Sequence, residues 1–183
     1  MSDIKFLKEY FASLKELLNN ENYLEDLVRV KEILKKTHSQ GKKTMIFGNG
    51  GSAAIASHVS VDLTKACKIR SVNFNEADLI TCFANDYGYE NWVKKGIDFY
   101  ADKKDLLICI SSSGMSKNII NGAKQAKKIG CNVVTLSGFS KSNSLKKQGH
   151  INLWVNSTNY NIVEMTHHIW LLSVVDLISK SKF

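Results

Sequence analysis

The sequence contains no proline, and only two of its 25 basic residues are arginine, namely Arg29 and Arg70. Its formal net charge of +8 would suit nucleic acid. However, proteins read base edges largely through arginine forks and bind through a clustered basic footprint, whereas these lysines are scattered. We therefore expect no nucleic-acid partner. The charge predicts a solvated lysine-rich surface or a field that attracts a small anionic substrate.

Long apolar runs and paired cysteine motifs are also missing. No apolar run reaches the roughly 18–20 residues of a membrane span. The first residues, MSDIKFLKEYFASL, lack the apolar core of a signal peptide. We therefore expect a cytoplasmic protein with no membrane partner. The cysteines form no CxxC pair and lie in or beside apolar runs, which predicts buried reduced thiols rather than disulfides or zinc ligands; they are Cys67, Cys82, Cys109 and Cys131.

What the sequence does contain is an alternation of short apolar strands with amphipathic helices. After two helices within residues 1–40, the pattern predicts strands at Thr44–Phe47, Ser71–Phe74, Leu106–Ile110, Val133–Leu136 and Ile151–Val155. The helices predicted between and after them are Ser52–Lys68, Ala77–Ala84, Tyr89–Tyr100, Ser116–Ile129 and Asn161–Ile178, with residues 85–88 as a turn. This order predicts an α/β fold, a three-layer sandwich with a five-stranded parallel sheet covered on both faces.

The length of 183 residues favours a single domain, residues 1–183, with enough apolar sequence for a full core. Within it we expect an N-terminal helical pair, residues 1–40, and a parallel α/β core, residues 41–183. Large aromatic side chains are interpreted as core or interface residues; they are Tyr89, Trp92, Trp154 and Trp170.

The first predicted strand is followed by Gly48-Asn49-Gly50-Gly51-Ser52. Glycines let the backbone turn sharply and approach a ligand. We expect Ser52 to cap the next helix, whose N-terminus would then present free N–H groups to an anion. A plain tight turn is the alternative. The stretch lacks the Gly-Lys-Ser/Thr of a Walker loop, and Ala53 replaces the third glycine of the dinucleotide fingerprint, so we expect no nucleotide cofactor.

The strand at Leu106–Ile110 is followed by Ser111-Ser112-Ser113-Gly114-Met115-Ser116. Hydroxyls and backbone N–H groups together can hold a phosphate through several hydrogen bonds without a lysine. A serine-rich turn can also be no more than a helix cap. Because ligands of parallel sheets bind at the carboxyl ends of the strands, the two junctions together favour phosphate binding.

Three stretches, GNGGSAA, ANDYGYEN and ISSSGMSKNI, resemble the sugar isomerase (SIS) family and most closely its bacterial phosphoheptose isomerase branch. The resemblance covers nearly the whole chain. It implies a homotetramer with active sites shared between subunits and a phosphorylated sugar as substrate. It places the phosphate on Ser111, Ser112, Ser113 and Ser116. It places the sugar chain along Asn49, Gly50, Gly51, Ser52, Asn85 and Asp86.

In phosphoheptose isomerases, the helix after GNGGS carries a histidine and a glutamate four residues apart. The last helix carries a glutamine and a second histidine, eight residues apart. The resemblance implies that these four groups can bind zinc and that the glutamate and second histidine form the acid–base pair. This sequence has His58 in place but Asp62 instead of the glutamate. The shorter side chain sets the carboxylate back by about 1 Å, which matters for a catalytic base.

The last helix departs further from the family pattern. Aligned on Glu164, it has Val163 in place of the glutamine and Leu171 in place of the second histidine. Neither can ligate a metal or move a proton. His167 lies one turn after Val163 and one turn before Leu171, on the same helix face. His168, which forms an i, i+4 pair with Glu164, is expected to face solvent or a subunit interface.

These substitutions predict a rearranged site. His58, Asp62 and His167 would surround a metal or the sugar, with Asp62, His167 and Glu164 as the catalytic candidates. The resulting hypothesis is an aldose–ketose isomerase that acts on sedoheptulose 7-phosphate or a similar sugar through an enediol, with zinc as its metal where one is used. The alternatives are a non-catalytic phosphosugar-binding or regulatory protein, and an isomerase of a different sugar phosphate.

Overall fold

The computed structural model describes residues 2–180 and is built on a five-stranded parallel sheet. The strand order is β2-β1-β3-β4-β5, so the chain moves outward in both directions from its central strands. Thr44 pairs with Ser71 on one side and Leu106 on the other. The strands are β1 (Thr44–Phe47), β2 (Ser71–Val72), β3 (Leu106–Ser111), β4 (Asn132–Ser137) and β5 (Ile151–Trp154).

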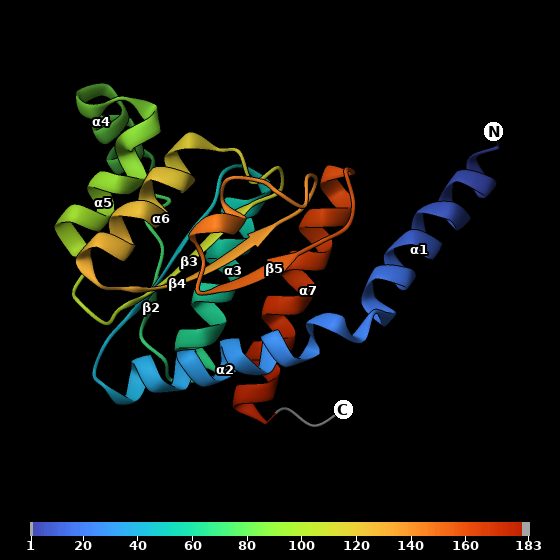
Figure 1. Ribbon diagram of the computed structural model, residues 1–183, viewed down its shortest axis with the longest axis horizontal. Coiled ribbons are helices and arrows are strands. Elements are labelled where there is room, and N and C mark those ends of the chain that lie inside the picture. Colours follow the sequence, from blue (N-terminus) through green and yellow to red (C-terminus); the bar gives the residue numbers. More distant parts are fainter. Residues whose placement is uncertain (1, 181–183) are drawn as a thin grey trace.

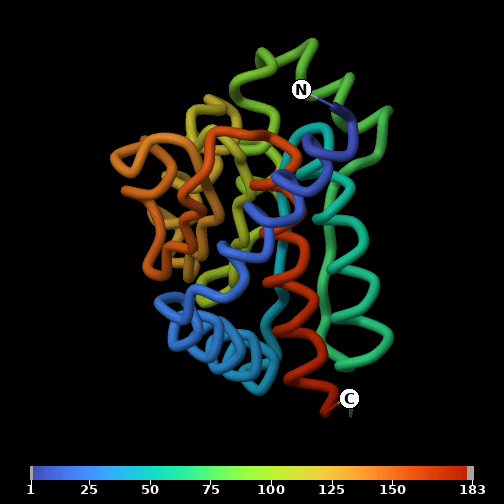
Figure 2. The backbone as a smooth tube through the Cα atoms, turned by 90° about the vertical axis from the view of Figure 1, so that its right-hand side faces the viewer, coloured from blue at the N-terminus to red at the C-terminus, as the bar shows by residue number. Residues whose placement is uncertain are grey.

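Helices cover both faces of the sheet, which confirms the predicted three-layer α/β fold (Figure 1). One face packs against α2 (Leu24–Ser39), α3 (Gly51–Lys65) and α7 (Tyr160–Ser179), and α7 lies between the other two (Figure 2). The opposite face packs against α4 (Ala77–Tyr87), α5 (Trp92–Tyr100) and α6 (Lys117–Ile129). The remaining helical segments are α1 (Asp3–Asn19), η1 (Glu21–Tyr23), η2 (Tyr89–Asn91) and η3 (Lys146–Gln148).

The core consists of two clusters separated by the sheet. Along β3, Ile108 packs toward α3 and α7, whereas Leu107 and Cys109 pack toward α5 and α6. Successive side chains of a strand point to opposite faces, and both faces are covered here, so the strand is apolar throughout. Each such aliphatic side chain contributes about 1.5–3 kcal/mol by leaving water. The core thus holds the carboxyl ends of β1 and β3 at fixed positions.

The helix α1 differs from the rest because none of its residues is buried. It extends away from the body of the molecule (Figure 1) and contacts α7, whereas α2 packs on α7 and β5. The two leading helices are therefore present, but each makes its own contacts with the core. The apolar side chains that α1 leaves exposed are Ile4, Phe6, Leu7 and Phe11.

Among the described residues, α7 is the one helix long and apolar enough to cross a membrane by length and composition, with a mean hydropathy of 1.3 over its window. Trp170, Leu171 and Val174 on this helix belong to the core cluster shared with α2 and α3. Its position between two core helices explains its apolar character.

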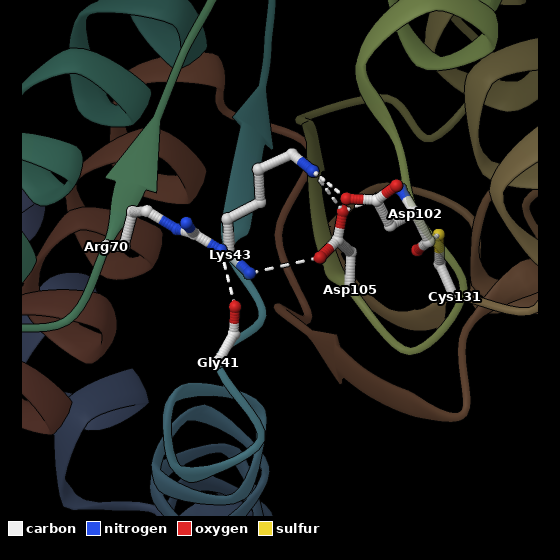
Figure 3. A network of polar contacts seen from close by, with 6 residues as sticks. All are labelled: Gly41, Lys43, Arg70, Asp102, Asp105 and Cys131. Atoms are coloured by element: carbon white, nitrogen blue, oxygen red, sulfur yellow. Dashed lines mark hydrogen bonds and ion pairs between the residues drawn. The ribbon is translucent and has the colours of Figure 1, made fainter.

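An ionic network joins the amino ends of β1 and β3 (Figure 3). The carboxylate of Asp105 has no exposed surface and accepts hydrogen bonds from Lys43 Nζ at 2.6 Å, Lys43 N at 3.0 Å and Asp102 N at 2.8 Å. Burial opposes the charge on Lys43, but its hydrogen bonds to Asp105 and Asp102 outweigh that effect and raise its pKa. Hydrogen bonds thus replace water around this buried charge, as burial requires.

The structure corrects two details of the sequence prediction at α4. The helix α4 continues to Tyr87, so Asn85 and Asp86 lie in its last turn rather than in a loop; Gly88, with φ of 82°, ends the helix. Cys82 is exposed on α4, because the residues in that stretch form a helix with one face in solvent. Cys109 and Cys131 are buried as expected, and burial raises the pKa of the Cys131 thiol to about 11. All four cysteines are free thiols.

Candidate active site at the carboxyl edge of the sheet

The first junction leads from β1 into α3 through a turn that only glycine adopts easily. Gly50 has φ of 53° and ψ of −123° and precedes the helix as its N-cap, without a side-chain cap. Ser52 is therefore not the cap predicted from the sequence. It is the second residue of α3 and is almost fully buried. Uncapped N–H groups of the first helical turn remain available to a ligand.

The second junction leads from β3 into α6. Ser116 is the N-cap of α6, and its hydroxyl accepts a hydrogen bond from Ser111 Oγ at 3.0 Å. Ser113 Oγ accepts from the backbone N–H of Met115 at 3.2 Å. Gly114 has φ of 65°, and a Cβ there would overlap the side chain of Asn143. The turn therefore needs glycine at this position for two reasons, conformation and space.

The two junctions meet around one cavity of about 120 Å³, as expected from adjacent parallel strands. Glu164, from the first half of α7, completes its wall and accepts a hydrogen bond from Ser112 Oγ at 3.3 Å. Its carboxylate lies so close to Gly51 that a Cβ there would overlap it. The residues that line the cavity are Asn49, Ser52, Ile110, Ser111, Ser112, Ser113, Ser116, Tyr160 and Glu164.

The side chain of Asn49 is held by a pair of reciprocal hydrogen bonds. Asn49 Nδ2 donates to Asn118 Oδ1 at 3.0 Å, and Asn118 Nδ2 donates to Asn49 Oδ1 at 2.8 Å. The hydroxyl of Tyr89 also donates to Asn49 Oδ1, at 3.2 Å. Asn118 is buried near the start of α6, whereas Tyr89 reaches over from η2 and is 55% exposed.

Below the cavity, along the seam between α3 and α7, lie His58, Asp62 and His168. His58 Nε2 is 3.2 Å from Asp62 Oδ2, and His58 Nδ1 is 2.9 Å from His168 Nε2. His168 is one turn from Glu164 on α7, so this group begins one turn away from the cavity wall. Burial, and then the neighbouring His58, lower the pKa of His168.

The structure does not bring His167 to His58 and Asp62. His167 has no exposed surface, and its Nε2 lies 3.2 Å from the carbonyl oxygen of Ser137 at the end of β4. Burial lowers the pKa of its imidazole to about 4, although the hydrogen bond to Ser137 acts in the opposite direction. The face it shares with Val163 and Leu171 is the core face of α7, since both of these side chains are buried.

Asn85 and Asp86 do not line the cavity. Both are exposed, and Asn85 Nδ2 donates a hydrogen bond to Asp86 Oδ1 at 2.9 Å. They therefore do not share the cavity with Asn49 and Ser52, which are predicted sugar contacts that line it.

The donor side chains of the described part of the chain do not fit a zinc site. Among residues 2–180, no group of three or more His, Cys, Asp and Glu side chains is arranged to hold a metal ion. His58 and Asp62 remain as two adjacent donors of the implied four. Val163 and Leu171 offer no ligating atom, and His167 is turned to β4.

Comparison with known proteins agrees with this architecture. Residues 5–138 match the family model described as SIS domain. The chain belongs to the SIS domain family. It is 31% identical over 179 residues to the phosphoheptose isomerase of Aliarcobacter butzleri, and the match covers 94% of each chain. A probable phosphoheptose isomerase of Thermoplasma acidophilum is 34% identical over 151 residues, 79% of this chain and 82% of that protein.

A solved structure, the phosphoheptose isomerase of Neisseria gonorrhoeae, superimposes with a TM-score of 0.92 and 23% identity over 98% of this SIS domain chain and 100% of that chain. At this identity the likeness shows the fold, and it includes the two leading helices. The SIS family membership and the fold expected from the sequence motifs are thereby confirmed.

Four polar residues at or near the cavity are not among the candidates found in the sequence. They are Tyr89, Asn118, Tyr160 and His168. The sequence predicts a core or interface position for Tyr89 and a solvent or interface position for His168. The signal for Asn118 was available, because a polar residue at the start of a helix that follows the serine turn points to the same edge of the sheet.

Proposed function

We propose that this SIS domain protein is a phosphosugar aldose–ketose isomerase of the phosphoheptose isomerase type, acting on sedoheptulose 7-phosphate or a similar sugar phosphate. The observation that carries the proposal is a single carboxylate, Glu164, in the wall of a cavity whose other side chains, apart from Ile110, carry hydroxyl or amide groups. Phosphoheptose isomerases that share about a third of its sequence over most of the chain support the same reaction class.

The phosphate group would bind at the serine turn. Ser111, Ser112, Ser113 and Ser116 bring four hydroxyls to the N-terminus of α6. Hydroxyl donors and the positive end of a helix dipole stabilise a phosphate without a basic side chain. The sugar chain would then extend toward Asn49, Gly50, Gly51 and Ser52 at the start of α3.

Isomerisation would require only internal proton movement. Glu164 would take the proton from the hydroxymethyl carbon of the ketose, and the electron pair would form the C=C bond of an enediol as the carbonyl becomes a hydroxyl. The same group would return the proton to the neighbouring carbon, while the hydroxyl proton of the first carbon leaves to form the aldehyde. No oxidant or reductant is needed, because one carbon is oxidised as the other is reduced.

His58 and Asp62 would provide the second acid–base group, together with His168 in place of His167. They form a hydrogen-bonded row at the α3–α7 seam, one turn from Glu164. We assign no proton transfer to His167 because its side chain is fully buried and its Nε2 faces the backbone carbonyl oxygen of Ser137. No proton transfer here involves zinc, because no three donor side chains among the described residues are arranged to hold it.

The test is NMR of the purified protein with sedoheptulose 7-phosphate in D₂O, with and without added zinc. The proposal expects new aldose anomeric signals and deuterium at the carbon beside the carbonyl. The matched variant is Glu164→Gln, which keeps the shape and removes the base; its rate should fall about 10³-fold. Saturable line broadening without exchange would contradict an isomerase acting on this sugar. Exchange that survives Glu164→Gln would exclude Glu164 as the base.

A non-catalytic phosphosugar-binding protein is the second candidate. The apolar side chains of Val163 and Leu171, where the family carries a glutamine and a histidine, favour it. This reading expects a phosphosugar to bind with similar affinity to the wild type and to Glu164→Gln, with no turnover by either. A panel of ketose phosphates of five to seven carbons in the same NMR assay separates it from an isomerase of another sugar.

We also propose a cytoplasmic homotetramer with sites shared between subunits. The apolar surface of α1 supports assembly, since Ile4, Phe6 and Phe11 are each more than half exposed in one subunit. Asn85 and Asp86 would then contact the sugar of a neighbouring subunit. Light scattering should give about four times the chain mass of 20.5 kDa. Phe11→Asp should dissociate the assembly, whereas Lys15→Asp on the same helix should not.

A further inference from the structure

The amide pair of Asn49 and Asn118 leaves Asn49 with one uncommitted hydrogen. An asparagine side chain has two donor hydrogens and two acceptor lone pairs. The oxygen of Asn49 accepts from both Asn118 and Tyr89, and one hydrogen of its nitrogen goes to Asn118. Among the described residues, no partner takes the second hydrogen. Asn49 can therefore offer the cavity a donor, but it has no free acceptor lone pair.

The two partners of Asn49 come from different parts of the fold. Asn118 is fixed on α6, where only 2% of it is exposed, and both of its bonds to Asn49 are short. Tyr89 stands on η2, which is itself tied to α6 by the hydrogen bond from Asn121 Nδ2 to the carbonyl oxygen of Glu90 at 3.0 Å. The orientation of the Asn49 amide is thus set by α6 and η2 rather than by its own glycine-rich loop.

We propose that Asn118 and Tyr89 are positioning residues that lock the Asn49 side-chain amide so that its free N–H is donated to an oxygen of the phosphosugar. This inference rests on the proposed function. The oxygen served is the one on which negative charge develops when the enediol forms. A donor held in place before the reaction stabilises such charge without reorganising. Asn118 itself does not line the cavity, so it acts through Asn49.

The decisive variant is Asn118→Asp, which has nearly the same shape but no donor. Two carboxylate oxygens would then face Asn49, so its NH₂ group would turn to them and its oxygen would face the substrate. We expect kcat to fall about 100-fold, the loss typical for one oxyanion donor. Inhibition by inorganic phosphate should stay within about threefold of the wild type, because the serine turn does not depend on Asn49. A merely structural role would weaken both together.

A second variant tests the proposal even if Asn118→Asp does not fold. Tyr89→Phe removes one exposed hydroxyl and should lower kcat about 3- to 10-fold, the range of one lost neutral hydrogen bond. Asn132→Asp at the start of β4, the opposite end of the sheet, controls for the added charge. It should leave kcat and phosphate inhibition as in the wild type.

The fixed orientation of Asn49 can also be measured without turnover, by proton exchange of its side-chain amide. The NMR signals of this amide are assigned by their absence in Asn49→Asp. In the wild type one of its two protons should exchange about tenfold more slowly than the other. Equal exchange, or an Asn118→Asp enzyme with kcat within threefold of the wild type, would overturn the proposal. If the wild type turns over no sugar while the two exchange rates differ as expected, the proposed function is wrong, but the positioning of Asn49 by Asn118 and Tyr89 is supported.

Discussion

The two edges of the sheet use polar groups in opposite ways. At the amino edge, Lys43 and Asp105 form a charged pair in which the carboxylate is fully buried and surrounded by protein donors. At the carboxyl edge, serine hydroxyls, the Asn49 amide and Glu164 line a cavity, and among residues 2–180 no partner takes the second hydrogen of the Asn49 amide. The Lys43–Asp105 pair is satisfied within the protein and stabilises the fold, whereas the cavity offers hydrogen-bonding groups to a ligand. Substitutions at the two edges should therefore affect different properties.

The largest effect is expected at the amino edge from Lys43→Met. Removing the lysine leaves the Asp105 carboxylate buried without its counter-charge, which costs about 3–5 kcal/mol of unfolding free energy. Urea unfolding at neutral pH measures it. Asp102→Asn is the matched control, because the side chain of Asp102 is 66% exposed and its pair with Lys43 is screened by solvent. A loss of unfolding free energy in Asp102→Asn as large as that in Lys43→Met would contradict the role given to burial.

His167 should make the stability of the carboxyl edge depend on pH. Its pKa is about 4 in the folded protein, against an ordinary value of 6.5, so the unfolded chain binds the proton more tightly between these values. The contribution of neutral His167 to the free energy of unfolding is therefore complete above pH 6.5 and is lost as pH falls toward 4. The total loss is on the order of 3 kcal/mol. Unfolding free energies at pH 5 and 7.5 measure it.

His167→Gln tests this assignment because the glutamine can still donate to Ser137 but does not titrate in this range. It should lower stability at pH 7.5 and flatten the dependence between pH 5 and 7.5. His38→Gln, on the exposed side of α2, should leave the His167 contribution in place. If the change in unfolding free energy between pH 5 and 7.5 is the same in His167→Gln as in the wild type, other groups cause the pH dependence.

Gly51→Ala should separate activity from stability at the carboxyl edge. The new Cβ would displace the Glu164 carboxylate, which is the flexible end of a side chain and can move at little cost. We expect kcat/KM to fall about 100-fold, the effect of a misplaced reacting group, with unfolding free energy within about 1 kcal/mol of the wild type. In a Glu164→Gln background, Gly51→Ala should add little further loss, because the two changes act on one group.

The smallest effect is expected from Ser116→Ala. It removes one hydroxyl from the serine turn and should raise KM about 10-fold, the value of one hydrogen bond to a charged group, with little change in kcat. Steady-state kinetics with the sugar that the wild type isomerises measure it. Ser142→Ala in the exposed loop after β4 is the control. A fall in kcat without a change in KM would place Ser116 away from the phosphate.

The sheet and the two junctions could be predicted because they depend on local patterns. Apolar runs such as Thr44–Phe47 define strands that are covered on both faces, and β1 has these bounds. Gly50 and Gly114 mark turns with positive φ that other residues rarely adopt. Parallel connectivity then places both turns at the same edge, so the serine turn and the glycine turn were expected to meet.

The choice between His167 and His168 could not be predicted in the same way. Neighbouring residues on a helix point about 100° apart, so the assignment depends on which face of α7 meets the sheet. The prediction placed His167 with Val163 and Leu171, and these three do share a face, but that face is buried. His168, one position on, contacts His58 instead.

The sequence by itself determined the order of strands and helices along the chain, the glycine-rich and serine-rich junctions and membership of the SIS family, because hydrophobic periodicity and short motifs carry that information. Only the tertiary structure decided that Glu164 contacts Gly51, that Asn118 and Tyr89 orient Asn49, and that Lys43 neutralises Asp105. These contacts join residues 40 to 113 positions apart. Their formation depends on how helices pack against the sheet, and no local pattern encodes that packing.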